Sequence, residues 1–196
     1  ERGDFTLGKE VGEFEEAWAT ATGADHAIGM SNGTDAIAIA LDAAGMEVGA
    51  EVVTSPVSFI ATAGGIIQAG GRPKFVDVDS PEAPNITAKT IPADVLASSE
   101  WFLPVLWAGS PHGIADWNTV SGGRVVLDAA QGVNALVGGE KIGELRNISA
   151  AAYSLHPLKN INVWGDGGMI STNHRSVDYN SRLLRNHGLA DRNNWT

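Results

Sequence analysis

The sequence Ser154-Leu155-His156-Pro157-Leu158-Lys159-Asn160 follows a short apolar run, residues 150–153, and precedes a glycine-rich stretch, residues 164–168. The apolar run predicts a buried strand, and the proline and glycines predict a constrained loop after it. A lysine in such a loop, when it is desolvated or set beside another cation, loses its proton and becomes a nucleophile toward carbonyl groups. Lys159 is therefore the first candidate for chemistry.

The composition is that of an acidic, globular protein without cysteine. The chain has 196 residues, of which 43% are hydrophobic and 18% charged, and this suits one α/β domain over residues 1–196. A formal net charge of -10 argues against nucleic acid and against an anionic membrane surface as partners. The absence of cysteine excludes disulfides and thiolate chemistry. With no signal-peptide pattern at its start and no apolar run of membrane-spanning length, the chain is predicted to be cytoplasmic.

Strand and helix signals alternate along the chain. Apolar periodicity predicts helices at 13–22, 36–44, 60–69 and 174–186, and strands at 26–30, 51–54, 74–78, 101–106, 124–127, 150–154 and 169–172. Several of these strands are continuous apolar runs, which is typical of strands buried on both faces. The sequence thus predicts a three-layer α/β fold, a mostly parallel sheet with helices on both faces and ligands beyond the carboxyl ends of the strands. Because the chain ends at Thr196 directly after a helical pattern, we expect a fragment of a longer protein.

Polar residues follow the predicted strands at the points where a ligand would lie. Gly33, Thr34 and Asp35 stand between a strand and a helix start, where free amides and the helix dipole can hold an anion. A capped helix without a ligand explains the same residues. Asp128 ends a strand between apolar neighbours, so its carboxylate needs a cationic or N–H partner, such as a protonated pyridine nitrogen. Helix capping is the alternative.

Three further residues complete this set. Phe59 follows a strand and could stack its ring on a flat ligand, although a core aromatic is the simpler interpretation. Ser154 could donate its hydroxyl to the same anion as Thr34, and Gln131 could reach a ligand oxygen. Together, these parts match pyridoxal 5′-phosphate, which needs a phosphate cup, a stacking ring, a carboxylate at its ring nitrogen and a lysine for a Schiff base.

Seven blocks of sequence carry a family resemblance. They are GMSNGTDA (29–36), SFIAT (58–62), FVDVD (75–79), DAAQ (128–131), SLHPLKN (154–160), GDGG (165–168) and LRNHG (184–188). In this order they resemble the DegT/DnrJ/EryC1/StrS aminotransferases, fold-type-I enzymes that depend on pyridoxal phosphate and mostly aminate keto-sugars. The resemblance implies the large domain of such an enzyme, without the smaller C-terminal domain, and a homodimer with active sites at the interface.

The resemblance also implies roles for individual residues. Lys159 would bind the cofactor covalently and shuttle a proton, Asp128 would pair with the pyridine nitrogen, and Gln131 would contact the phenolic oxygen or its neighbourhood. The phosphate would be held by Gly33, Thr34, the Asp35 backbone and Ser154, and Phe59 would stack on the ring. Asp166 would shape the loop after the lysine, and His187 is expected to be a buried packing residue.

Two positions bear on the substrate. A related branch that dehydrates deoxysugars carries histidine in place of the lysine, so Lys159 argues against that branch. After Val105 the family often has histidine, where this chain has Leu106. The amino donor is expected to be glutamate, and residues 158–166 resemble the subgroup that aminates an eight-carbon ulosonic sugar.

Other functions remain open from the sequence. They are a pyridoxal-phosphate-dependent sugar dehydratase, a cyclitol aminotransferase and a cofactor-binding domain that is inactive as truncated. A doubly wound nucleotide-binding domain would use Gly33 and Thr34 for phosphate, but it lacks a G-x-G-x-x-G turn and leaves Lys159 unexplained. A metal site is not predicted, because the five histidines lack ligand spacing.

Overall fold

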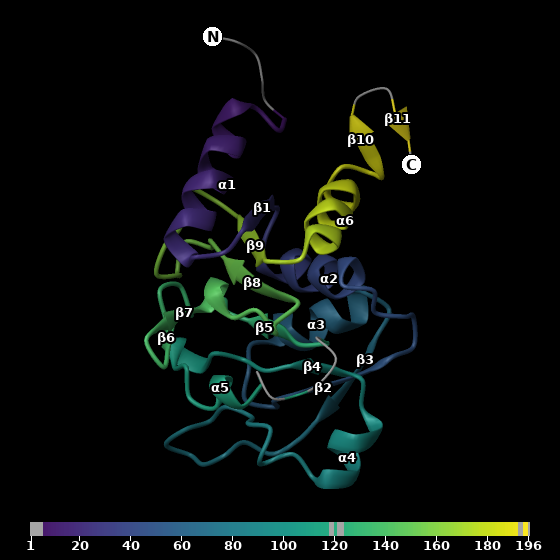
Figure 1. The fold of residues 1–196 in the computed structure, drawn as a ribbon, viewed down its shortest axis with the longest axis vertical. Helices are drawn as coiled ribbons and strands as arrows, with labels where there is room; N and C mark the ends of the chain where they lie inside the picture. Colours follow the sequence, from purple (N-terminus) through teal and green to yellow (C-terminus); the bar gives the residue numbers. More distant parts are fainter. Residues whose placement is uncertain (1–5, 118–119, 121–123, 192–193, 196) are drawn as a thin grey trace.

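The computed structural model describes residues 6–117, 120, 124–191 and 194–195. Its centre is a sheet in the order β1-β9-β8-β5-β4-β2-β3 (Figure 1). These strands are β1 (His26–Met30), β2 (Glu51–Thr54), β3 (Arg72–Phe75), β4 (Trp101–Leu103), β5 (Val126–Asp128), β8 (Ala150–Ser154) and β9 (Gly168–Thr172). Parallel bridges from Phe102 to Val125 and from Val105 to Asp128 join β4 to β5. All of these strands run the same way except β9, which is antiparallel to β1 and to β8, so the prediction of a mostly parallel sheet is confirmed.

Four longer helices and several short elements connect the strands. The longer helices are α1 (Lys9–Thr22), α2 (Gly33–Ala43), α3 (Ile60–Gln68) and α6 (Arg175–Arg185). The short ones are α4 (Ala93–Ser98), α5 (Ile114–Trp117) and the 3-10 turns η1 (Trp107–Gly109) and η2 (Ile142–Glu144). Two small hairpins are formed by β6 (Leu136–Val137) with β7 (Glu140–Lys141) and by β10 (Leu189–Asp191) with β11 (Asn194–Trp195).

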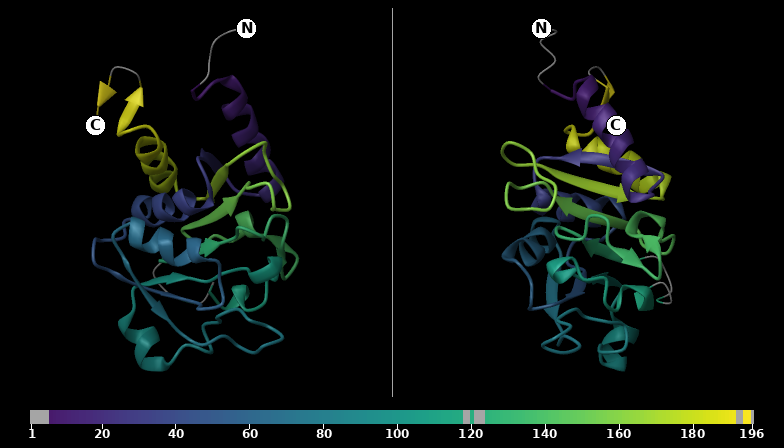
Figure 2. Two further views of the ribbon diagram at one scale, coloured as in Figure 1. Left: turned by 180° about the vertical axis from the view of Figure 1, so that it is seen from behind. Right: turned by 90° about the vertical axis from the view of Figure 1, so that its left-hand side faces the viewer.

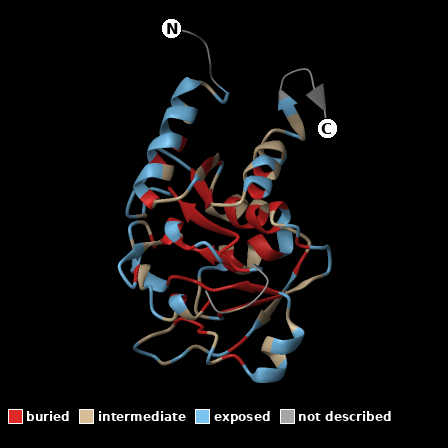
Figure 3. Ribbon diagram, in the orientation of Figure 1, coloured by how far each residue is buried: buried red, intermediate tan, exposed pale blue. Residues whose placement is uncertain are grey.

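Helices cover both faces of the sheet, as the sequence predicted. Successive strand residues point to opposite faces, and the two faces bury separate apolar clusters. Val52 packs with Ile37 of α2 and Ile66 of α3, whereas Val53 belongs to the cluster that holds Trp18 of α1 and Trp117 of α5. Figure 3 shows this buried interior along the strands, with exposed residues on the outer helices and loops. Because the helical layers cover the two faces of the sheet, a ligand can reach the sheet at the ends of its strands.

Several predicted boundaries are wrong for identifiable reasons. The strand expected at 74–78 lies at Arg72–Phe75, because β3 is an edge strand, where Pro73 is tolerated. The strand expected at 101–106 ends at Leu103, before Pro104, which has no N–H to donate. Helix α2 begins at Gly33 rather than at residue 36, since Asn32 is its N-cap.

The apolar face that the sequence pattern predicts for α1 is also wrong. The pattern places Phe14, Ala17, Trp18 and Ala21 on one face of the helix, but only Trp18 is buried; the other three are exposed. Glu15 is buried instead. The reason is an ionic contact with α6, in which Arg182 and Arg185 of α6 both bind the Glu15 carboxylate. Charge pairing across the fold therefore decides how this helix is rotated.

The sheet direction brings the functional segments to one edge. Strands β1, β2, β5 and β8 end at Met30, Thr54, Asp128 and Ser154, and the chain leaves each of them at the same side of the sheet. The loop between β8 and β9 stands out from the body in the side view (Figure 2). Helices α1 and α6 project together at one end of the molecule, and α4 lies at the opposite end (Figures 1 and 2).

Candidate active site

One cavity of about 660 Å³ lies at this edge of the sheet. All eight site residues predicted from the sequence line it: Gly33, Thr34, Asp35, Phe59, Asp128, Gln131, Ser154 and Lys159. Cavities of similar volume lie beside α4 and between α1 and α6. Volume alone therefore does not single out the site; the combination of a lysine, a buried acid and a helix N-terminus does.

Asp128 is the buried acid at this cavity, with 5% of its surface exposed. The Thr62 hydroxyl donates to its Oδ2 at 2.6 Å, and the backbone N–H of Ala130 donates to its Oδ1 at 3.1 Å. Burial raises the pKa of Asp128, and these two donors and the charge of Lys159 only partly offset that effect. A cationic N–H partner in the cavity would stabilise the ionised carboxylate further.

Lys159 is half-buried in the loop after β8. Its backbone N–H donates to the His156 carbonyl at 2.8 Å, which closes a turn around Pro157. The loop is tied to the strand end by two more bonds, from Leu155 N–H to the Gly167 carbonyl at 2.8 Å and from Val163 N–H to the Leu155 carbonyl at 3.0 Å. The backbone on both sides of Lys159 is thus held while its side chain faces the cavity.

The N-terminus of α2 packs against the ends of β8 and β9 without space for side chains. A Cβ at Gly33 would lie 2.7 Å from the Cβ of Ser154, and a Cβ at Gly168 would lie 2.3 Å from the carbonyl oxygen of Asn32. Real Cβ contacts are longer than this, so both positions need glycine. The Ser154 hydroxyl and the first amides of α2 are consequently neighbours, as a shared anion site requires.

Asp35 lines the cavity, but its backbone N–H already donates to the Asn32 side chain at 2.8 Å. The expected phosphate contact from that N–H is therefore taken by the helix cap in this conformation. The Asp35 carboxylate accepts from Ser31, from Gln68 at 2.8 Å and from Asn32 at 3.0 Å. The Ser31 hydroxyl is the main cause that holds the pKa of Asp35 below its ordinary value, with Gln68 and Asn32 adding to it.

Phe59 and Gln131 both line the cavity, but they differ in what holds them. Phe59 precedes α3 as its N-cap and is 70% exposed, so the alternative of a core aromatic is wrong. The side-chain oxygen of Gln131 accepts from the Ala108 backbone N–H at 3.0 Å. Because a backbone N–H can only donate, this bond orients the Gln131 amide and leaves its NH₂ as the group offered to a ligand.

The sequence missed some residues of the site and misjudged others. Thr62 lies in the first turn of the helix after β2, and a hydroxyl at that position was the signal that it could reach the neighbouring strand end. His187 is exposed, with a positive φ of 59°, so the expectation of buried packing is wrong. Leu106 is 1% exposed and its side chain belongs to the apolar core.

Two features are absent from the part of the chain that the structure describes. Within the ranges given above, no group of three or more histidine and acidic side chains is placed to hold a metal ion. In the same part of the chain, no helix is long and apolar enough to cross a membrane.

The sequence profile of the DegT/DnrJ/EryC1/StrS aminotransferase family matches residues 1–196. The chain belongs to this family. Among the curated relatives of this DegT/DnrJ/EryC1/StrS chain, the pleiotropic regulatory protein of Geobacillus stearothermophilus is 42% identical over 94% of the chain and 50% of its own length. The UDP-N-acetyl-3-dehydro-alpha-D-glucosamine 3-aminotransferase of Acidithiobacillus ferrooxidans is 35% identical over 94% and 50%. The chain spans about half the length of the curated relatives it matches.

Solved structures of aminotransferases share the fold of the DegT/DnrJ/EryC1/StrS chain. DesV of S. venezuelae, solved in complex with a ketimine intermediate, matches with a TM-score of 0.88 and 30% identity over 98% of this chain and 52% of its own. NtdA of Bacillus subtilis, solved with bound cofactor pmp, matches with a TM-score of 0.82 and 27% identity over 99% and 44%. The predicted family and the predicted fold-type-I large domain are thereby confirmed.

Proposed function

We propose that the protein is a pyridoxal-phosphate-dependent aminotransferase that moves an amino group from an amino acid to a nucleotide-linked keto-sugar. One observation carries the proposal: Lys159 and the buried Asp128 face the same cavity as the N-terminus of α2. A lysine, an acid and an anion site in one hollow match the three fixed points of this cofactor. The family match and the aminotransferase relative support the reaction class.

The residues present fit the cofactor. Asp128 is buried with an elevated pKa, and Lys159 is the cation that acts on it among the described residues, so a protonated ring nitrogen would supply a second positive charge. At the other end, Gly33 is packed so tightly on Ser154 that a phosphate can approach the backbone amides and the hydroxyl together. The exposed ring of Phe59 provides an apolar surface at the rim for a flat ligand.

When bound, the cofactor supplies an electron sink next to the reacting carbon. The chain's own residues do the rest. Asp128 would keep the ring nitrogen protonated, and the Thr62 hydroxyl, which donates to the Asp128 carboxylate, would orient it for that contact. The Nζ of Lys159 would hold the cofactor and would accept and return a proton. The N-terminus of α2 and Ser154, which line the same cavity, would hold the phosphate.

The substrate is assigned by class. Curated relatives act on nucleotide-linked sugars by name, such as the UDP-linked 3-dehydro-glucosamine of the Acidithiobacillus enzyme and the glucuronate of its Pseudomonas aeruginosa counterpart. We extend that class to this protein, with glutamate as the amino donor. An eight-carbon ulosonic sugar is the narrower hypothesis, based on the resemblance of residues 158–166. A cytoplasmic location stays a prediction.

A homodimer is part of the proposal. Large apolar side chains are exposed to solvent around the cavity and on the adjoining loop: Phe59 is 70% exposed, Ile60 75%, Leu158 87% and Trp164 is fully exposed. Phe59 and Leu158 line the cavity itself. Apolar groups gathered at a site mark an interaction surface, and a second copy of the protein covering this face would also close the cavity.

A second candidate function is regulatory. It is favoured by the name of the Geobacillus relative, a pleiotropic regulatory protein. A regulator that binds the cofactor without transamination would use the same cavity. Sugar dehydration and cyclitol amination also remain, and product analysis with keto-sugars, deoxysugars and cyclitols separates these outcomes from amination.

The decisive test is an absorbance scan of the protein mixed with pyridoxal phosphate. A borohydride-reducible band of the protein-bound cofactor is expected in the wild type and is expected to vanish in Lys159→Ala. Lys74→Ala is the matched control. Lys74 lies on the edge strand β3, away from the cavity, and pairs with Glu51 of β2 at 2.7 Å. Identical spectra for the wild type and Lys159→Ala would remove the assignment.

A further inference from the structure

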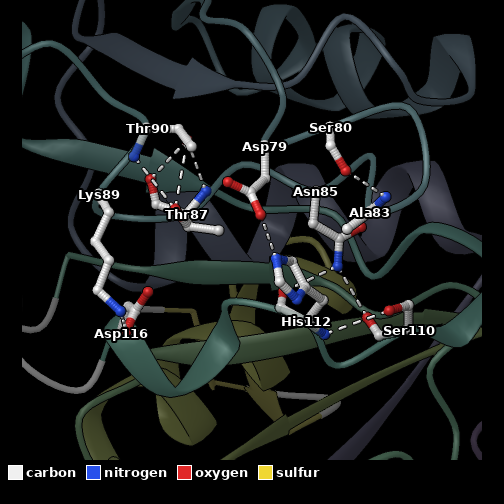
Figure 4. Close-up of polar contacts among 10 residues, drawn as sticks. All are labelled: Asp79, Ser80, Ala83, Asn85, Thr87, Lys89, Thr90, Ser110, His112 and Asp116. Atoms are coloured by element: carbon white, nitrogen blue, oxygen red, sulfur yellow. Dashed lines mark hydrogen bonds and ion pairs between the residues drawn. The ribbon is translucent and has the colours of Figure 1, made fainter.

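A buried asparagine outside the cavity bonds with the turn that contacts Gln131, which lines the cavity. Asn85 is fully buried in the irregular segment between β3 and α4. Its Nδ2 donates to the carbonyls of Ser110 at 3.0 Å and His112 at 3.1 Å, and its Oδ1 accepts from Trp107 N–H at 3.2 Å. Figure 4 shows Asn85 beside Ser110 and His112. The amide thus uses its oxygen and both its hydrogens on one turn, residues 107–112.

That turn has an unusual backbone. Ala108 has a φ of 51° and Gly109 a φ of 78°. A non-glycine residue in the left-handed region persists only where the surroundings fix it. The three bonds from Asn85 flank Ala108 on both sides, and a further contact of His112 with Asp79 at 2.7 Å ties the end of the turn to the same segment (Figure 4).

The turn meets the cavity through Gln131. The Ala108 N–H donates to the side-chain oxygen of Gln131 at 3.0 Å. A Cβ at Gly109 would lie only 2.7 Å from the Gln131 carbonyl oxygen, so the turn lies directly against this residue. With its oxygen held from behind, Gln131 presents its NH₂ to whatever fills the cavity.

We propose that Asn85 is a positioning residue for the active site: it fixes the 107–112 turn so that the Ala108 N–H orients the Gln131 amide toward the cofactor. Asn85 acts through the turn and does not itself line the cavity. The inference rests on the proposed function for the nature of the ligand. The chain of contacts from Asn85 to Gln131 stands on the geometry alone.

The test is a double-mutant cycle read by titration of the protein with pyridoxal phosphate. Asn85→Ala is expected to weaken cofactor binding roughly tenfold, the factor that one lost hydrogen bond gives. In a Gln131→Ala background the same change is expected to have little further effect. Thr87→Val is the matched control, because Thr87 is buried in the same segment but its hydroxyl, within the part of the chain that the structure describes, bonds with Thr90 and not with the 107–112 turn (Figure 4). Equal losses in both backgrounds, or an equal loss in Thr87→Val, would overturn the proposal.

A second measurement leaves Asn85 intact, in case its replacement prevents folding. Hydrogen–deuterium exchange of the cofactor-free protein, resolved to single amides, compares the wild type with Gln131→Ala. The Ala108 amide is expected to exchange faster in the variant, while the Trp107 amide, held by Asn85, stays protected. Faster exchange at both would mean that Gln131 holds the turn, and the proposal would fail.

The two hypotheses fail separately. If the wild type shows no Lys159-dependent band with pyridoxal phosphate, the proposed function is wrong. The exchange pattern at Trp107 and Ala108 then still reports whether Asn85 fixes the turn.

Discussion

Asp128 meets opposing demands from folding and from function. Its carboxylate is buried with two hydrogen-bond donors and the field of Lys159, and these do not restore its ordinary pKa of 3.8. A group whose folded pKa lies above its unfolded value stabilises the fold fully below the unfolded pKa. That stability is lost as the pH rises through the folded pKa. At neutral pH the raised pKa of Asp128 therefore costs the cofactor-free protein stability, relative to an acid that keeps its ordinary pKa in the fold.

Replacing this acid with its neutral isostere separates the two demands. Asp128→Asn is expected to raise the free energy of unfolding of the cofactor-free protein at neutral pH. Each unit by which the folded pKa exceeds the unfolded one corresponds to about 1.4 kcal/mol. Urea unfolding from about pH 4 to about pH 8 should show the advantage of the variant growing with pH. Binding of pyridoxal phosphate should weaken in the same variant, and a stability difference that does not change with pH would contradict this account.

At the residue scale, the sequence could predict which groups meet but not what holds them. Asp128 and Lys159 each follow a strand, and a parallel sheet brings such positions to one edge. The partners that tune them are another matter. Thr62 lies 66 residues from Asp128 along the chain, and the turn that orients Gln131 depends on a left-handed alanine. Such contacts arise from loop conformation, for which the residue pattern carries no periodic signal.

Glycines inside helices show how closely the elements are packed. Gly12 in α1 and Gly65 in α3 have the same low helix propensity. A Cβ at Gly12 would meet nothing within 4 Å, whereas a Cβ at Gly65 would lie 2.6 Å from Cγ2 of Ile37 and 3.1 Å from the carbonyl of Thr34. Helices α2 and α3 therefore touch at Gly65, close to the start of the anion site.

This contrast predicts opposite effects for one substitution. Gly12→Ala is expected to stabilise the protein by about 1 kcal/mol, because alanine is the better helix former and fits without a clash. Gly65→Ala is expected to destabilise it by about 1–3 kcal/mol through overpacking, and to weaken binding of pyridoxal phosphate because α2 shifts. Thermal unfolding of both variants checks the prediction. A rise in Tm for Gly65→Ala would show that α3 can move away freely.

Strong periodic signals placed the elements well, and weak ones did not. The strands at His26–Met30, Glu51–Thr54 and Ala150–Ser154 coincide with their predicted bounds, since each is a short, mainly apolar run bounded by turn-forming or polar residues. The short helices α4 and α5 and the small hairpins escaped prediction, because elements of a few residues leave no measurable period. The wrong face assigned to α1 has a different origin, which lies at the scale of the whole molecule.

Glu15 joins the two ends of the described chain across the sheet. Its carboxylate accepts from Gly29 N–H at 2.8 Å and from Arg182 at 2.8 Å, and it also binds Arg185. Arg182 lies 167 residues away in sequence, and it bonds in addition with Asp178 at 2.8 Å. Through these contacts, α1 and α6 are fixed on either side of β1. In the sequence pattern, Glu15 is only a charged residue in an amphipathic helix, so the sequence alone could not reveal its partners in α6.

The contacts of Glu15 also make the stability of the protein depend on pH. Burial acts to raise the pKa of Glu15, but the Gly29 N–H, Arg182 and Arg185 together outweigh it and hold the pKa below its ordinary value of 4.5. A carboxylate with a depressed folded pKa contributes stability above its unfolded pKa and loses it as the pH falls through the folded pKa. The contact between α1 and α6 should therefore weaken below about pH 4.5.

Glu15→Gln tests this arrangement. The change removes the charge that Arg182 and Arg185 share, so that Arg182 keeps its pair with Asp178 while Arg185 loses its ion pair with Glu15, and it is expected to destabilise the protein by about 3 kcal/mol. The estimate takes the low end of the range for a broken buried pair because Arg182 remains 39% exposed. Glu13→Gln is the matched control on the same helix, where an exposed pair with Lys9 contributes less than about 0.5 kcal/mol. Urea unfolding at neutral and acidic pH should show a large loss for Glu15→Gln at neutral pH that shrinks in acid. If both variants lose the same stability, the ends of the chain are held by apolar packing and not by this charge.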